Sequence, residues 1–269
     1  LDPDTFTSAE SWEISRLAAG AAIGAVDAVL DARAGRAAAL VRPPGHHSNR
    51  DLARGFCLVN NAAVAVAHAL DRGCGRVAVV DFDVHHGNGT QEIFEADPRV
   101  LYVSTHQWPF YPGTGAAGDV GRDEGRGFTV NVPIERGATD ADYELVFDAV
   151  VVPVTRQFQP DLVLVSAGFD AHAEDPLGAM RMSAAGFGRL TGRLCAVADA
   201  CAGGRLVLVT EGGYHLRAMA ASLAASLGAM AGRQAGEAAP QASDPAGTGR
   251  GAEAVRLVRA AQAPFWRGL

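Results

Sequence analysis

The sequence predicts a single α/β domain over residues 1–269, with a mostly parallel central sheet and helices on both faces. Three observations support this fold class. Apolar segments alternate with longer helical stretches along most of the chain, the strongest apolar segments are continuous, and no second core is evident. Continuous apolar strands separated by helices are typical of parallel sheets covered on both faces.

Six segments have the composition of buried strands. They are residues 37–41, 76–81, 100–104, 128–132, 161–166 and 205–210. Helices are expected at about 11–33, 59–70, 140–159 and 183–201, from 216 onward, and at 252–266, where the last would fold back onto the body. Thr7 and Glu10 have capping-box spacing before the first helix. Residues 232–249, rich in Ala, Gly, Pro and Ser, are expected to form a flexible connection.

The composition is that of an ordinary globular protein, with 48% hydrophobic and 20% charged residues. The net charge of −7 argues against a general nucleic-acid binder, which normally has a basic surface. No apolar run is long enough to span a bilayer and no signal peptide opens the chain, so a cytoplasmic location is expected. The four cysteines fit neither a zinc finger nor a disulfide framework and are expected to be free thiols. The first residue is Leu1, which indicates a longer product or processing.

The chemically unusual residues lie at the carboxyl ends of the predicted strands, where open α/β sheets bind ligands. Seven of the eight histidines lie in or beside these loops, and only His68 falls within a predicted helix. The loops read RPPGHH at 42–47, DFDVHHGNG at 81–89, STH at 104–106, SAGFDAH at 166–172 and EGGY at 211–214. This clustering does not fit a random scatter of surface histidines.

The loop after the second strand predicts a metal site. Asp81, Asp83 and His85 share one side of an extended chain, because residues two apart point the same way. Two buried carboxylates repel strongly unless a cation or hydrogen-bond donors compensate them. A divalent metal held by Asp83 and His85, with Asp170 from a neighbouring strand, would compensate them and leave positions open for water and substrate. The alternative is that these residues cap helices or form salt bridges.

Together the motifs resemble the histone deacetylase family. RPPGHH, GFCLVNN, DFDVHHGNGTQ, STHQ, YPGTG, SAGFDAH and EGGY occur in that family's order and approximate spacing, from about residue 4 to residue 232. Asn88 and Glu211 make the chain more similar to class II and bacterial members than to class I. The resemblance implies the arginase–deacetylase fold and zinc-dependent hydrolysis of an acyl-lysine peptide or protein, or of a small acylated amine.

The resemblance implies which side chains do the chemistry. His47 would act as general base and then general acid, and His46 would assist electrostatically. Asp81 would orient His46 and Asn88 would orient His47. Since a carboxylate raises imidazole basicity and an amide mainly fixes its orientation, His47 is expected to be less basic than His46. Tyr214 would donate its hydroxyl to the developing oxyanion.

Two cations are implied in the same way. One zinc ion would bind Asp83, His85 and Asp170, although such ligands could also accept iron(II) or cobalt(II). A structural potassium ion would bind groups of Asp81, Asp83, His85, Ser104 and Thr105.

The residues implied to contact substrate are Gly55, Phe56, Tyr111, Leu177 and Gly212. Phe56 and Tyr111 would line a narrow tunnel around the aliphatic stem of an acyl-lysine. Gly212 would let the backbone turn tightly beside the substrate. Leu177 stands where polyamine-selective relatives often have an acidic residue, which favours lysine substrates. The family's acidic residue that holds the substrate backbone is expected to lie upstream of Leu1.

Three other functions remain open at this stage. An acetylpolyamine amidohydrolase would share the fold and the metal site. Arginase-like hydrolysis would need two manganese ions and additional aspartates, which Asn88 and the HisHis loop do not provide. A non-catalytic scaffold that binds acyl-lysine is disfavoured by Tyr214. The preferred acyl group, the physiological substrate and the oligomeric state are not legible from the sequence.

Overall fold

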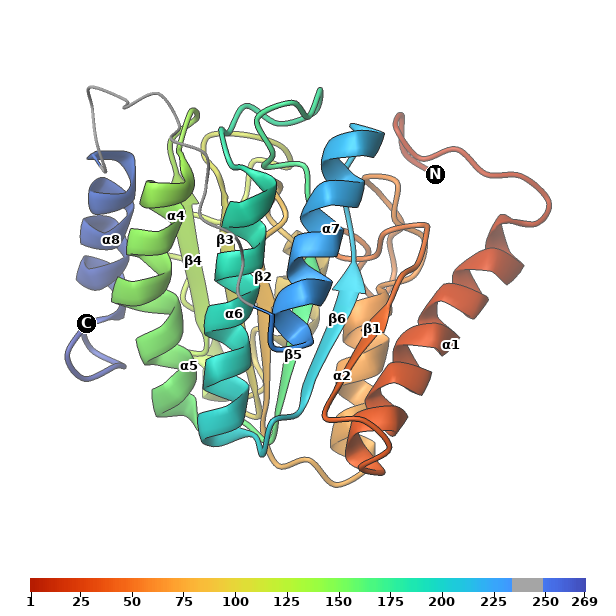
Figure 1. Cartoon of the computed structure of the whole chain (residues 1–269), viewed down its shortest axis with the longest axis horizontal. Coiled ribbons are helices and arrows are strands. Elements are labelled where there is room, and N and C mark those ends of the chain that lie inside the picture. The colour runs from red at the N-terminus through yellow and green to blue at the C-terminus, as the bar shows by residue number, and fades with distance from the viewer. Residues whose placement is uncertain (234–248) are drawn as a thin grey trace.

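Six parallel strands form the central sheet in the part of the chain that the computed structural model describes, residues 1–233 and 249–269 (Figure 1). The strands are β1 (Arg36–Ala39), β2 (Val77–Asp81), β3 (Val100–Gln107), β4 (Thr129–Ile134), β5 (Leu162–Ala167) and β6 (Leu206–Thr210). Their order in space is β1-β6-β5-β2-β3-β4, so β5 and β2 lie in the middle. The predicted parallel sheet is confirmed.

Helices cover both faces of this sheet (Figure 1). One face carries α1 (Ser11–Leu30), α2 (Asn61–Asp71) and α3 (Asn88–Phe94), and the other carries α4 (Asp140–Val146), α5 (Val152–Phe158), α6 (Ala184–Cys201), α7 (Leu216–Met230) and α8 (Gly249–Gln262). Along β2, Val77 and Val79 pack into the core on the α1–α3 face, whereas Ala78 and Val80 pack into the core on the α4–α8 face. Because neighbouring strand residues point to opposite faces, an uninterrupted apolar strand serves both cores.

The helix expected at 140–159 is interrupted in its middle. A π-helical segment, Phe147–Val151, separates α4 from α5. Pro153, in the first turn of α5, has no backbone N–H to donate to the preceding turn, and the wider turn accommodates it.

Several local predictions were wrong, including the ends of the first strand, of α1 and of α8. Glu10, not Thr7, occupies the N-cap of α1 without a side-chain cap bond, while the Ser8 N–H donates to Ser11 Oγ at 2.8 Å. β3 continues past Ser104 to Gln107, because its last residues pair with β4. The short helix α3 was not expected, since its Gly-rich start is typical of a loop.

The C-terminal helix folds back onto the body, as predicted. Gln262 Nε2 donates to the Thr129 carbonyl at 2.7 Å, and Trp266 Nε1 donates to the Gly127 carbonyl at 3.0 Å. The connection expected at 232–249 lies, apart from its ends, outside the described residues. The cysteines are free, Cys57 and Cys195 being buried. None of the helices in the described ranges is long and apolar enough to cross a membrane.

Candidate active site

The strand register brings the polar loops together at one edge of the sheet. Asp81, the last residue of β2, pairs with Ser166 of β5 on one side and with Ser104 of β3 on the other. The loops that follow these three central strands therefore start side by side. β6 lies next to β5 and brings the EGGY loop to the same edge.

Asp83, His85 and Asp170 meet at this edge. One ligand atom from each residue lies within 4.8 Å of the other two. His85 Nδ1 lies 3.1 Å from Asp83 Oδ1 and 3.2 Å from Asp170 Oδ2. Both carboxylates are fully buried, and His85 is only partly so. The cluster thus has two anionic oxygens and an imidazole nitrogen converging from two adjacent loops.

The electrostatics of this cluster favour a cation. Burial, and then the charge of Asp83, raise the pKa of the Asp170 carboxyl. Burial opposes protonation of His85, but hydrogen bonds to Asp170 and Asp83 raise its pKa to about 10. The site therefore draws positive charge toward the two carboxylates. A divalent metal fits this donor set of two carboxylates and one imidazole.

Two glycines let the backbone pack against the ligands. The Gly212 N–H donates to Asp83 Oδ2 at 2.8 Å. A Cβ at Gly212 would lie 2.2 Å from Asp170 Oδ2, and one at Gly168 would lie 2.0 Å from Asp83 Oδ2. Gly212 was expected to contact substrate; it lies against the metal-ligand cluster and is not part of the pocket lining described below.

Two adjacent histidines each have the partner predicted for them. His46 Nδ1 donates to Asp81 Oδ2 at 3.0 Å, and His47 Nδ1 donates to Asn88 Oδ1 at 2.9 Å. Because the amide oxygen only accepts, the hydrogen of neutral His47 is held on Nδ1 and its Nε2 keeps a free lone pair. The two imidazoles lie 4.1 Å apart, centroid to centroid.

The two histidines differ in basicity in the expected direction. Burial opposes protonation of His46, but the carboxylates of Asp83 and Asp81 outweigh it and raise the pKa of His46 well above its usual value. Burial, and then the positive charge of His46, hold the pKa of His47 well below its usual value. His47 is therefore the neutral member of the pair, able to accept a proton.

A pocket of about 300 Å³ opens above these groups. Its lining contains the predicted residues Gly55, Phe56, Tyr111, Leu177 and Tyr214 together with both histidines and His85. The Tyr111 ring packs edge-on against His47 at 5.0 Å, and the Phe56 ring lies 5.8 Å from Tyr214. Gly55 has φ +58°, and a Cβ there would lie 2.5 Å from the His47 ring. The loop thus needs glycine at this position to pack against His47.

Three residues that no prediction assigned to the site also line the pocket, namely Pro44, Phe110 and Asp4. Phe110 lies in it and stacks on His85 at 5.3 Å. Asp4 lies at its edge, so an acidic residue is present at the mouth although one was expected only upstream of Leu1. The Gly55 N–H donates to Asp2 Oδ2 at 3.3 Å, which holds the N-terminal segment against this rim. No motif surrounds Asp4, so only the folded chain reveals its location.

Glu211 was also not predicted as a site residue, because the sequence singled it out only as a point of similarity to class II and bacterial members of the family. Its carboxylate is fully buried. Oε2 accepts the N–H groups of Gly45 at 2.6 Å and His46 at 3.1 Å, and Oε1 accepts the Ser166 hydroxyl at 3.0 Å. One side chain therefore fixes the backbone of the HisHis loop to the ends of β5 and β6.

Of the residues implied to bind potassium, Asp83 and His85 belong to the metal-ligand cluster, and Asp81, Ser104 and Thr105 lie on the adjacent strands β2 and β3. Asp81 pairs with Ser104 in the β2–β3 register, and the Thr105 hydroxyl donates to the Asp81 carbonyl at 3.4 Å. The Ser104 hydroxyl is hydrogen-bonded to His106 Nδ1 at 2.9 Å. His86 and His106, without an assigned role, pack against each other at 4.8 Å.

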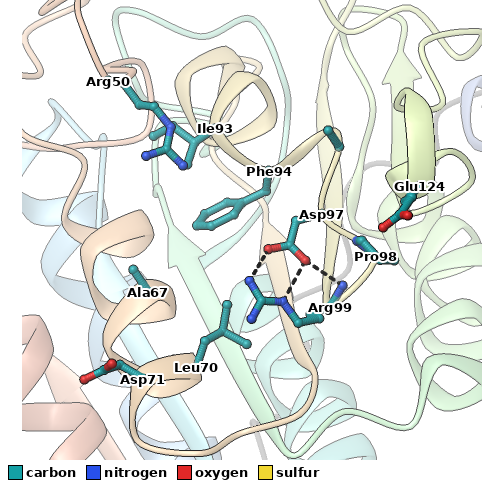
Figure 2. A pocket seen from close by; sticks show the side chains of 11 residues that line it. Arg50, Ala67, Leu70, Asp71, Ile93, Phe94, Asp97, Pro98, Arg99 and Glu124 are labelled. Carbon is teal, nitrogen blue, oxygen red and sulfur yellow. Dashed lines mark hydrogen bonds and ion pairs between the residues drawn. The ribbon is translucent and has the colours of Figure 1, made fainter.

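A larger hollow of about 820 Å³ lies elsewhere, near the amino end of β3 (Figure 2). It is lined by parts of α2 and α3 and by the residues that lead into β3. Its central charges pair with each other, since Arg99 donates to Asp97 at 2.7 Å. It contains no histidine or cysteine. The smaller pocket, which is lined by His46, His47 and His85 beside the metal-ligand cluster, is therefore the candidate active site.

Comparisons with known proteins show what this chain is similar to. Residues 1–230 match the histone deacetylase domain family. The chain is 44% identical to a probable deacetylase of Archaeoglobus fulgidus over 80% of this chain and 60% of that protein. It is 45% identical to the human polyamine deacetylase HDAC10 over 96% of this chain and 39% of that protein, so it spans only part of either relative. The crystal structure of the HDA15 HD domain superposes with a TM-score of 0.91 and 43% identity, over 98% of this chain and 73% of that one.

Proposed function

We propose that this chain, which belongs to the histone deacetylase family, is a zinc-dependent amidohydrolase that removes acyl groups from lysine side chains. The observation that carries the proposal is the convergence of Asp83, His85 and Asp170 beside a pair of oriented histidines. A zinc ion bound there would polarise the amide carbonyl and lower the pKa of the attacking water. Relatives named as deacetylases support the same class of reaction.

The protein's own side chains would move the protons. His47 is neutral and presents Nε2, so it can take the proton of the attacking water and return it to the leaving amine. His46, paired with Asp81, provides a positive charge beside the developing negative charge. Tyr214 lines the pocket, and its hydroxyl would donate to the oxyanion.

The pocket walls would hold the substrate. Phe56, Phe110 and Tyr111 surround a narrow space suited to the methylene stem of a lysine. Asp4 at the edge can accept hydrogen bonds from the backbone N–H groups of a bound peptide. A potassium ion would further offset the negative charge of the buried carboxylates. It would be held by groups of Asp81, Asp83, His85, Ser104 and Thr105.

The pairing of His47 with Asn88 gives a pH-dependent prediction. Replacing Asn88 with aspartate puts a carboxylate at the His47 Nδ1–H and raises the pKa of His47. A base with a higher pKa stays protonated to a higher pH, so the acidic limb of the kcat/KM profile should move to higher pH by about one unit. Steady-state rates from pH 5 to 9 measure the shift. An unchanged acidic limb would mean that Asn88 does not orient the general base.

A second candidate substrate is an acylated polyamine. The human relative's name favours it, and Asp4 places negative charge at the pocket mouth. Leu177, 39% exposed at the same rim, offers no partner for a second amine. We therefore expect the zinc-loaded protein to prefer acetyl-lysine peptides over acetylspermidine, measured as kcat/KM. A zinc-loaded protein without turnover on either substrate contradicts the proposed function.

Leu177 should control this choice. Glutamate at position 177 would pair with the distal amine of acetylspermidine, so kcat/KM for acetylspermidine should rise about 10-fold while that for a neutral acetyl-lysine peptide changes little. Leu17→Glu, on the exposed side of α1, is the matched control and should change neither value. If L177E changed kcat/KM for both substrates by the same factor, Leu177 would not control the choice between them.

A further inference from the structure

We propose that Asp175 is a positioning residue that holds Tyr214 at the reacting centre. The inference rests on the oxyanion-donor role proposed above for Tyr214. Asp175 lies in the loop after β5, and its carboxylate reaches across to the loop after β6. Oδ2 accepts the N–H of Tyr214 at 2.6 Å and that of His215 at 3.1 Å.

The other carboxylate oxygen binds within its own loop. Oδ1 accepts the Leu177 N–H at 2.9 Å, and the Asp175 N–H donates to the His172 carbonyl at 3.0 Å. Asp175 is only 7% exposed. A buried carboxylate that accepts three backbone N–H groups is strongly held, because such hydrogen bonds are charge-assisted. One side chain thus joins the pocket rim at Leu177 to the segment carrying Tyr214.

Tyr214 has little else to fix it. Among the described residues, its N–H bond to Asp175 is its one hydrogen bond, and its hydroxyl has no partner. Its ring contacts Phe56 at 5.8 Å and the Arg42 guanidinium at 5.6 Å, both from partly exposed side chains. Gly213 precedes it with φ +129°, a conformation that glycine adopts readily. Asp175 therefore supplies the directional restraint on the position of Tyr214.

Asp175 also lies at the start of α7. The N–H of His215, the N-cap residue of that helix, is one of the groups that its carboxylate accepts. An acidic side chain is favourable at a helix N-terminus. Through His215, Asp175 therefore links the position of Tyr214 to the fifteen-residue helix α7 as well as to the loop.

The experiment is a double-mutant cycle in the full zinc-loaded chain, with an acetyl-lysine peptide as substrate. Asp175→Ala should lower kcat by about 10- to 100-fold with KM changed less than about threefold, since small displacements of a reacting group are costly. In the Tyr214→Phe background the same change should lower kcat by less than about threefold, because the hydroxyl that Asp175 positions is already absent. Equal factors in the two backgrounds would overturn the proposal, since a merely structural role gives that result.

Two further variants keep the test decisive. Asp175→Asn retains one oxygen for the Tyr214 N–H, so its kcat should lie within about fivefold of the native value. If D175N instead lowered kcat as much as D175A, and by the same factor in the Y214F background, the proposal would also be overturned. Glu174→Ala, at the exposed neighbouring position, is the control and should leave kcat unchanged. Zinc content is measured for each variant. A zinc-loaded native chain without turnover would contradict the proposed function itself. A Y214F protein with native kcat would overturn only the positioning role of Asp175, so the two failures are distinguishable.

Discussion

Replacing Asp170 with asparagine is expected to abolish stoichiometric zinc binding and to lower kcat at least about 10³-fold, because the metal contributes several kcal/mol of charge stabilisation. Asparagine keeps the size of the side chain and can still accept the Val84 N–H, which Asp170 Oδ1 accepts at 2.8 Å. The change thus removes an anionic ligand without opening a cavity. Metal analysis and initial rates on an acetyl-lysine peptide measure the two effects.

Thermal unfolding gives an independent readout of the same change. A ligand that binds only the folded state raises its stability by mass action, so zinc should raise the Tm of the native chain and not that of D170N. Asp142→Asn is the matched control, because Asp142 is a fully buried carboxylate that accepts the Gly251 N–H at 2.8 Å, away from the cluster. That variant should lose stability but keep zinc. Native zinc content and turnover in D170N would contradict the proposed metal site.

The parallel sheet was predictable because its strands are short, continuous and apolar. Val77–Asp81 and Leu162–Ala167 are buried at every position, and their polar residues, Asp81 and Ser166, occur only at or next to the carboxyl end. The helix ends were less predictable, since they depend on local competition between hydrogen bonds. At the start of α1, a Ser8–Ser11 bond forms in place of the Thr7–Glu10 box. Similarly, Pro153 turns an apparently continuous helix into two helices joined by a π-helical segment.

The metal and proton-transfer residues could be predicted because they are adjacent in sequence or follow neighbouring strands. The period-two argument for Asp81, Asp83 and His85 assumed an extended chain, but β2 ends at Asp81 and residues 83–85 form a bend, so it is their closeness in sequence that brings them together. Each predicted histidine partner then lies within 3.0 Å of its imidazole. Their roles in catalysis stay predictions, which the variants above test.

The residues that hold these groups in place could not be predicted in the same way. Glu211 and Asp175 act through backbone N–H groups of other loops, and a backbone N–H carries no sequence signal. Asp4 reaches the pocket only because the N-terminal segment lies over Gly55. Each of these contacts joins residues 39 or more positions apart along the chain. Tertiary packing decides them.

The buried carboxylates of the site fall into two groups according to what surrounds them. Asp83 and Asp170 face each other and need a cation, whereas Glu211 and Asp175 are satisfied by N–H and hydroxyl donors. Asp83 also accepts the N–H groups of His85 at 2.9 Å and of Gly212 at 2.8 Å, so the number of donors does not distinguish it from Glu211 and Asp175. What distinguishes Asp83 and Asp170 is that each lies close to the other carboxylate and to an imidazole, an arrangement that suits a metal ion.

Replacing Tyr214 with phenylalanine should lower kcat about 10²- to 10³-fold while zinc content and KM stay close to native, because one oxyanion donor is lost and the pocket keeps its shape. Burial, and then the charges of Asp170 and Asp83, raise the pKa of the Tyr214 hydroxyl, so it remains protonated and able to donate. Because that hydroxyl has no partner among the described residues, its loss breaks no hydrogen bond within that part of the chain.

Tyr143→Phe is the matched control for this prediction. Tyr143 is fully buried and its hydroxyl has no hydrogen-bond partner among the described residues, so its removal should leave kcat within about threefold of native and should not lower the Tm. Single-turnover measurements with saturating enzyme assign the loss in Y214F to the chemical step and not to product release. A Y214F rate constant close to that of Y143F would show that the oxyanion is stabilised by another group, and the case for Asp175 as the residue that positions Tyr214 would end with it.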